Sequence, residues 1–226
     1  MGVTVPNSFV GATDETPLKL LRAFSAAGRH LRTKNWRSLT YEHTFDTADG
    51  TLAYALPTSP AFDRLVAATT YDRTQFRGAT GPYSPAQWQY GEALLSSPGQ
   101  LNTVFRIKRN ASRVDQLFLL DDPGGTYTIA FEYVTNEWIY DGSSTYYADV
   151  QADADVPLFD DFLMELETTW RALRALGEPY FDEKAEAIER AEMLYAQENP
   201  MVLDMRPRVR RFTNLIDNVP ETGYGL

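Results

Sequence analysis

Hydrophobic residues recur at helical spacing near both ends of the chain, and at alternating spacing between them. Thr16-Pro17 is a typical helix start, because threonine caps the first turn and proline fits its first position. The apolar stripe that follows consists of Leu20, Phe24, Ala27 and Leu31. Gly28 weakens such a helix by about 1 kcal/mol relative to alanine. The sequence therefore predicts a helix over 16–32 that packs closely against a neighbour at Gly28.

The second helical region begins at Asp160-Asp161, where carboxylates suit the positive end of a helix dipole. One apolar stripe consists of Leu163, Leu166, Trp170 and Leu173, and Gly177 then favours a helix end. A further helix is expected over 179–197. Its predicted inward residues are Phe181, Ala185, Ile188 and Tyr195. The short connection around 176–179 predicts an αα-hairpin.

Alternating apolar residues dominate the middle of the chain. Segments 39–45 and 51–56 flank the turn Asp46-Thr-Ala-Asp-Gly50, which predicts a β-hairpin. Segments 103–109 and 117–120 are expected to pair as strands, and 126–134 is the strongest strand candidate.

Shorter elements are expected between these strands, namely one helical turn over 62–68, a strand over 71–76 and a helix from Pro85 to 95. The resulting fold class is α+β. We expect an antiparallel helical bundle, made of the N-terminal helix and the C-terminal αα-hairpin, with a β-rich insert and an extended C-terminal arm. The predicted units are an arm and helix (1–36), the insert (37–157), the helical hairpin (158–198, packed against 16–32) and a docking arm (199–226).

Charge changes this picture, because it is concentrated in one segment. Residues 149–198 contain 14 Asp and Glu against 4 Lys and Arg, which equals the net charge of −10 of the whole chain of 226 residues. Such a distribution is typical of a surface that meets other subunits or nucleic acid. The isoelectric point of about 4.7 argues against tight direct binding of DNA.

Composition excludes several other classes of protein. The chain has no cysteine, so disulfides and thiolate metal sites are excluded, which fits a reducing cytosol. No stretch of about 18 apolar residues is present, which argues against a membrane span. The N-terminal residues lack a basic segment followed by an apolar one, so we expect no secretory signal.

Candidate catalytic and metal-binding residues are few. His30 and His43 are the two histidines, and neither stands in a metal-ligand pattern. No nucleophile motif or phosphate-binding loop is present. Asp149, Asp153 and Asp155 offer oxygen ligands for a hard cation, but their spacing is not that of an EF-hand. The other interpretation is a solvated loop with helix capping by Asp160 or Asp161. We therefore expect no catalytic residues, no metal and no cofactor.

A cluster of arginines follows the last predicted helix. It consists of Arg206, Arg208, Arg210 and Arg211, next to Phe212. One interpretation is a solvated tail that offsets the acidic helices. Another is a docking arm, since an extended segment can add a strand to a neighbouring sheet while its arginines bind carboxylates. Binding to the phosphates of packaged DNA is a third.

The order of short motifs resembles that of a known family. These motifs are Tyr54-Ala-Leu-Pro57, Phe62-Asp63-Arg64, Tyr71-Asp72-Arg73-Thr74, Gly81-Pro-Tyr-Ser-Pro-Ala-Gln-Trp88, Phe131-Glu-Tyr-Val-Thr-Asn-Glu-Trp138, Ala152-Asp-Ala-Asp-Val-Pro-Leu158, Trp170-Arg171 and Gly177-Glu-Pro-Tyr180. Together they resemble the head–tail adaptor (connector) proteins of short-tailed bacteriophages and prophages, related to the tail tubular protein A family. The likeness covers roughly residues 15–198. The long tail, 201–226, departs from the pattern.

The resemblance implies a non-enzymatic virion protein that forms a ring of twelve subunits. Its partners would be further copies of itself, the portal protein and the tail nozzle or tube protein. DNA would pass through without sequence-specific binding, and no membrane would be involved. We expect Arg206, Arg208, Arg210, Arg211 and Phe212 to dock on the portal. An acidic face is expected to line the channel or a subunit seam, and it consists of Asp182, Glu183, Glu186, Glu189 and Glu192. The protein would assemble in the host cytoplasm and end at the head–tail interface.

Two alternatives remain open from sequence. A carbohydrate-binding or glycan-cleaving module would use the 13% aromatic residues to stack on sugars. However, Trp36, Trp88, Trp138 and Trp170 stand where core or hairpin packing explains them. The other alternative is an unrelated α+β domain whose acidic helices form a solvated face.

Overall fold

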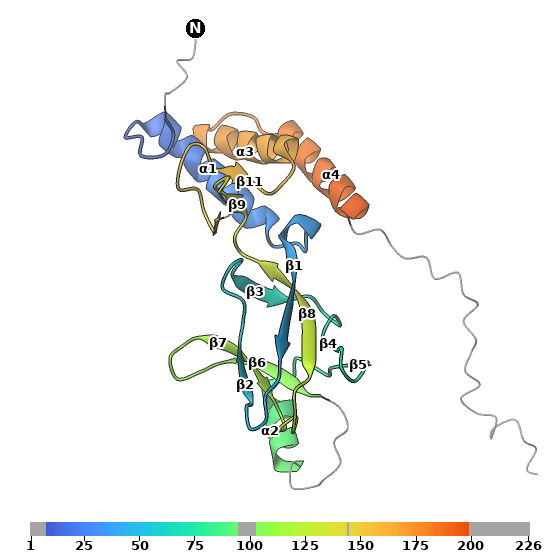
Figure 1. The fold of residues 1–226 in the computed structure, drawn as a ribbon. Helices are drawn as coiled ribbons and strands as arrows, with labels where there is room; N and C mark the ends of the chain where they lie inside the picture. Colours follow the sequence, from blue (N-terminus) through green and yellow to red (C-terminus); the bar gives the residue numbers. More distant parts are fainter. Residues whose placement is uncertain (1–7, 95–102, 144, 199–226) are drawn as a thin grey trace, which may run out of the picture.

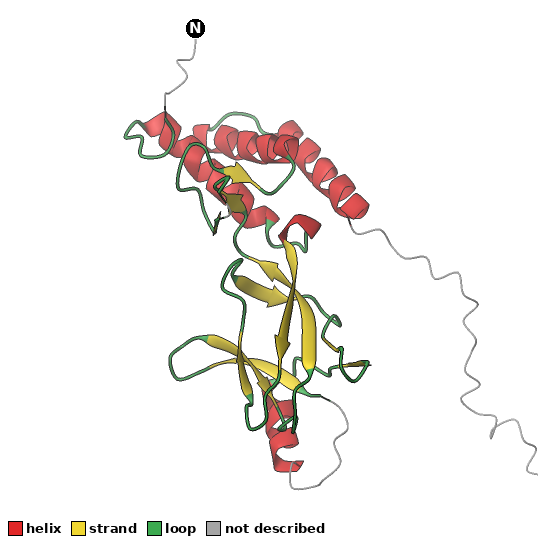
Figure 2. Ribbon diagram, in the orientation of Figure 1, coloured by secondary structure: helices red, strands yellow, loops and turns green. Residues whose placement is uncertain are grey.

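The longest helices lie at one end of an elongated molecule, and the longest antiparallel strands lie toward the other (Figures 1 and 2). The computed structural model describes residues 8–94, 103–143 and 145–198. Its helices are α1 (Glu15–Leu31), the 3-10 helix η1 (Arg37–Leu39), α2 (Pro85–Leu94), α3 (Asp161–Leu176) and α4 (Phe181–Glu198). The predicted α+β class is confirmed.

The described strands form three sheets. The first contains β1 (Thr40–Asp46), β8 (Thr128–Thr135), β4 (Tyr71–Asp72) and β5 (Arg77–Gly78) in that order, with β3 (Phe62–Leu65) also paired to β8. The second contains β2 (Ala53–Ala55), β7 (Asp115–Leu119) and β6 (Phe105–Arg109). The third contains β10 (Tyr146–Tyr147), β9 (Ile139–Tyr140) and β11 (Val156–Pro157).

Strand β8 is the centre of the β-rich half. Six of its eight residues are buried, because both of its faces are covered, and only Glu132 is exposed. It pairs with β1 from Thr40↔Val134 to Asp46↔Thr128, while β3 and β4 occupy its other edge. The prediction of a strong strand at 126–134 is confirmed, as is the pairing of β6 with β7.

Each of the two halves has its own hydrophobic core. In the β-rich half, the first and second sheets share a core of Phe105, Leu117, Phe131 and Tyr133, among others. Figure 1 shows α2 at the far tip of this half, and Trp88 of α2 packs there against Val104 and Leu120.

The core of the helical half is built around two tryptophans. Trp36 and Trp138 are 2% and 0% exposed, and each contacts Phe159. Their indole nitrogens donate to the carbonyls of Leu31 and Ala148, each at 2.7 Å, so both buried N–H groups are paired. The sequence prediction of core packing is confirmed for both residues and for Trp88, which is 3% exposed. Because Trp138 lies between β8 and the third sheet, that small sheet joins the helical core.

The predicted hairpin between 39–45 and 51–56 is wrong. Strand β1 pairs with β8, and β2 pairs with β7 instead. The turn itself was predicted correctly, since Gly50 has the expected positive φ, of +73°. However, β8 offers β1 seven paired positions and a buried face, which no three-residue strand can match.

Two shorter predictions also need correction. The segment expected as a helical turn at 62–68 begins with strand β3, because β8 has a free edge there that pairs with it. The strand expected over 71–76 ends at Asp72. The Asp72 carboxylate accepts from the amides of Thr74 and Gln75 at 3.0 and 2.9 Å, so the chain turns.

Candidate interaction surfaces

Helix α4 carries the five residues predicted to form the acidic face. Asp182, Glu186, Glu189 and Glu192 are exposed, and Glu183 is half-buried. None of the ion pairs in the described part of the chain involves any of these five carboxylates. They therefore project uncompensated negative charge from one helix.

The two cations of α4 point toward the rest of the chain. Arg190 pairs with Asp160 at 3.1 Å, and the Lys184 ammonium lies 5.6 Å from the ring centre of Trp170. Arg190 is thus committed to Asp160, although Glu186 stands four residues before it at the usual distance for a helical ion pair. The two cations of the helix thus face the rest of the chain, whereas most of its carboxylates are exposed.

The predicted inward residues of α4 are largely wrong. Phe181 and Ile188 are 73% and 47% exposed, and Ala185 is exposed as well. The buried residues of the helix are Ala187 and Ala191, because small side chains let α4 approach α3 closely. Tyr195 is the exception: it is partly buried, and its ring meets Trp36 edge-on at 5.6 Å. Met193 is 44% exposed too. Large apolar side chains therefore accompany the acidic face.

A groove of opposite charge lies between α1 and α3. This basic groove, of about 540 Å³, is lined by Lys19, Arg22, Ala23, Ala26, Trp170, Arg171, Arg174 and Ala175. Its floor is apolar, whereas four of its eight side chains are cations. The sequence did not reveal it, because the cations come from two helices about 150 residues apart.

The cations of the basic groove differ in how they are held. Arg171 bonds the buried carboxylate of Glu167, and burial, together with the nearby Arg174, lowers its pKa to about 10. Lys19 pairs with Glu15 at 2.7 Å. Arg22 and Arg174 are exposed and belong to no ion pair of the described residues. Two positive charges of the groove thus remain available to a partner.

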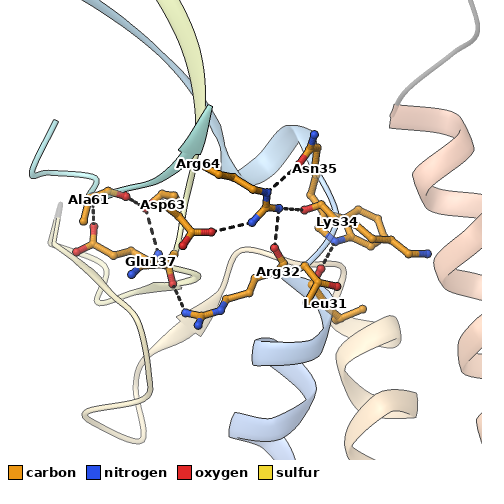
Figure 3. Close-up of polar contacts among 12 residues, drawn as sticks. Leu31, Arg32, Lys34, Asn35, Ala61, Asp63, Arg64 and Glu137 are labelled. Carbon is orange, nitrogen blue, oxygen red and sulfur yellow. Dashed lines mark hydrogen bonds and ion pairs between the residues drawn. The ribbon is translucent and has the colours of Figure 1, made fainter. Parts of the chain in front are cut away.

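Arg64 joins the helical half to the β-rich half. Figure 3 shows its side chain reaching from β3 to the end of α1. The guanidinium donates to the carbonyls of Arg32 and Lys34 at 2.9 and 2.8 Å and to the Asn35 amide oxygen at 3.1 Å. A fourth bond, of 2.7 Å, goes to Asp63. This contact uses nearly the full fork geometry of arginine, which fixes the relative orientation of the two elements.

A second set of contacts lies beside the first. Glu137 accepts from the amide of Ala61 at 2.9 Å, and Arg32 donates to the carbonyl of Asn136 at 3.3 Å (Figure 3). Together with Arg64, these bonds link the segment after β8 to both α1 and β3. The junction is therefore hydrogen-bonded from several directions.

The acidic loop uses its carboxylates within the chain. Asp153 accepts from the amides of Phe9 and Val10, at 3.0 and 2.7 Å to the same oxygen. Asp155 accepts from the amides of Gln151 and Ala152, and Asp149 pairs with Arg29. These contacts support the interpretation as a capped loop. Within the described residues, no group of three or more His, Asp or Glu side chains is arranged to hold a metal ion.

The two histidines lie apart from one another in the fold. His30 is at the end of α1 and His43 is within β1. Burial lowers the pKa of both, and for His30 the charges of Arg171 and Lys34 act in the same direction.

The predicted portal-docking residues Arg206, Arg208, Arg210, Arg211 and Phe212 lie outside the described residues. Their role stays a prediction.

Comparison with known proteins adds no family. No family model matches the chain, and no curated protein matches it either. In the part of the chain that the structure describes, no helix combines the length and the apolar character needed to cross a membrane.

Proposed function

We propose that this chain is a head–tail adaptor of a short-tailed bacteriophage or prophage. In this proposal, twelve copies form a ring beneath the portal, join it to the tail nozzle or tube, and extend the channel through which DNA leaves the capsid. The N-terminal helix and the C-terminal helical hairpin form an antiparallel bundle in each subunit. The protein has a structural role in the virion and no enzymatic one.

The observation that carries the proposal is the outward surface of α4. It combines uncompensated carboxylates with the exposed side chains of Phe181, Ile188 and Met193. Large apolar residues exposed on a helix beside charged ones are typical of a surface that meets a partner. In a ring, such a surface is covered by the neighbouring subunit.

The separation of the two halves gives further support. An adaptor has to contact different partners at its two ends, and the helical and β-rich halves lie at opposite ends of this molecule (Figure 1). The Arg64 contacts hold these halves in one orientation. We propose that the helical half faces the portal and the β-rich half faces the tail.

The overall charge of −10 fits a conduit for DNA. A negatively charged ring repels the phosphate backbone, so DNA passes without being held. No sequence-specific contact is required.

The carbohydrate-binding alternative has weaker support. Sugar-binding sites use exposed aromatic rings, but Trp36, Trp88 and Trp138 are at most 3% exposed. Trp170 is partly exposed, yet Arg171 covers its ring at 4.1 Å from the ring centre, and Tyr180 stacks against it.

Co-sedimentation with the portal protein of the same genome tests the proposed function. The chain is expected to migrate with portal rings, and native mass spectrometry of the complex should give twelve copies per portal ring. An absence of association at both low and physiological salt would contradict the adaptor function. Hydrolysis of bacterial glycans by the same preparation would instead favour the carbohydrate-directed alternative.

A further inference from the structure

We propose that the basic groove between α1 and α3 receives the acidic face of α4 from a second copy of this chain. This inference rests on the proposed ring and specifies its seam. It assigns the acidic carboxylates to the contact between subunits rather than to the channel wall.

The groove provides one half of the match. Arg22 projects from α1 and Arg174 from α3, both exposed and without an ion pair among the described residues. Between them, Ala23, Ala26 and Ala175 leave an apolar floor that can accept helical side chains. A helix that enters this groove is expected to carry carboxylates beside apolar residues.

Helix α4 provides the other half. Glu186 and Glu189 are exposed and uncompensated, and the exposed apolar side chain of Met193 stands four residues after Glu189 on the same side of the helix. The groove is lined by residues 19–26 of α1 and 170–175 of α3, so it can contact about two turns of α4. The two surfaces thus agree in charge and apolar character.

The arrangement of the helices explains why the partner is another copy. Ala187 and Ala191 hold α4 against its own chain, so its acidic face points away from that chain. Each copy therefore carries an acidic surface and a basic one at different places. Two different complementary surfaces on one chain form a heterologous contact, which closes into a ring when the rotation between copies permits.

Two charge-reversed variants of the full-length protein test the inference. The first, Glu186→Lys with Glu189→Lys, makes the α4 face basic. The second, Arg22→Glu with Arg174→Glu, makes the groove acidic. Neither pair takes part in an ion pair within the described residues, so circular dichroism and thermal unfolding should match the wild type. Asp49→Lys with Asp121→Lys, two exposed positions in the β-rich half, is the matched control.

Sedimentation velocity then measures association of each variant alone and of an equimolar mixture. Each reversed variant alone should self-associate at least about tenfold more weakly than the wild type, because like charges meet at every seam. The mixture should recover association, since each variant's helix matches the other's groove. On portal rings, the mixture should form the collar that each variant alone fails to form, and the control should behave as the wild type.

The outcomes separate this inference from the proposed function. If the wild type forms collars and both reversed variants do so as well, the seam is elsewhere and the inference is overturned while the adaptor function stands. If only the α4 variant fails and the mixture does not recover, the acidic face meets another occupant, such as the arginine-rich segment or the channel. If the mixture associates in free solution but no protein binds the portal, the seam stands and the adaptor function fails.

Discussion

Close packing at single residues decides how the helical half is stabilised. A Cβ added at Gly28 would overlap the ring of Trp138, which is completely buried. Gly28 thus allows the indole to lie against the backbone of α1. The sequence predicted this close approach, because a glycine in a helix needs a compensating reason. It could not identify the partner, which lies 110 residues away and is placed by β8.

We expect Gly28→Ala to destabilise the protein by about 1–3 kcal/mol through overpacking. Helix propensity alone would stabilise the same variant by about 1 kcal/mol, so the sign of the change separates the two effects. Urea unfolding measures it. The control is Ala26→Gly, an exposed position on the same helix, which should cost about 1 kcal/mol. A stabilised Gly28→Ala protein would contradict the packing described around Trp138.

Arg64→Lys tests the junction between the two halves. Lysine keeps the positive charge but cannot form the fork of bonds to Arg32, Lys34 and Asn35. The expected loss of stability is about 1 kcal/mol, since lysine cannot replace all of the bonds and the carbonyl of Arg32 is partly buried. Arg109→Lys is the matched control because its ion pair with Asp115 is largely exposed, and it should change stability by less than about 0.5 kcal/mol. Equal effects of the two substitutions would argue against a special role of Arg64.

Helix α3 shows which structural features can be predicted from neighbouring residues in the sequence. The predicted start at Asp160-Asp161 and the stop at Gly177 are confirmed: Asp160 accepts from the amide of Leu163 at 3.0 Å, and Gly177 has a φ of +79°. Such signals act within one turn, so the sequence contains them. The inward face of α4 was predicted wrongly because the helix has apolar residues on more than one side. Packing against α3 determines that the alanines are buried, and the periodicity of apolar residues could not predict this.

The pairing of Asp160 with Arg190 gives a pH-dependent prediction for α3 and α4. Burial raises the pKa of Asp160, but the bonds from Arg190 and the Leu163 amide outweigh it and leave the pKa below the usual 3.8. The folded state therefore gains stability above pH 4, which is lost as the pH falls through the lowered pKa.

Asp160→Asn keeps the cap but removes the charge. It should cost less than about 1 kcal/mol at pH 7, because the pair is partly exposed, and nothing once the pH is below the lowered pKa. Asp160→Ala should cost about 1 kcal/mol more at neutral pH because the cap is lost. Urea unfolding between pH 3 and 7 checks both values. A difference between wild type and Asp160→Asn that does not change with pH would exclude the charge effect.

For the whole molecule, the uneven distribution of charged residues along the chain was the property most easily predicted from the sequence. The excess of acidic residues in 149–198 was evident from the sequence, and six of its 14 Asp and Glu lie on α4. The opposing basic groove was not, because Arg22 and Arg174 become neighbours only when α1 packs on α3. Likewise, the sequence predicted a β-rich insert but not its strand pairing, which β8 decides through long-range contacts.

Negative-stain microscopy of this protein, mixed with the portal protein of the same genome, shows directly whether the chain forms a ring on the portal. We expect portal rings with an added collar of density, closed around an open axial channel and divided into twelve repeats. The collar should be lost with the α4 or groove variant alone and return with their mixture. Portal rings that stay bare at both low and physiological salt, or that bind scattered single copies without a closed collar, would contradict a ring-forming adaptor.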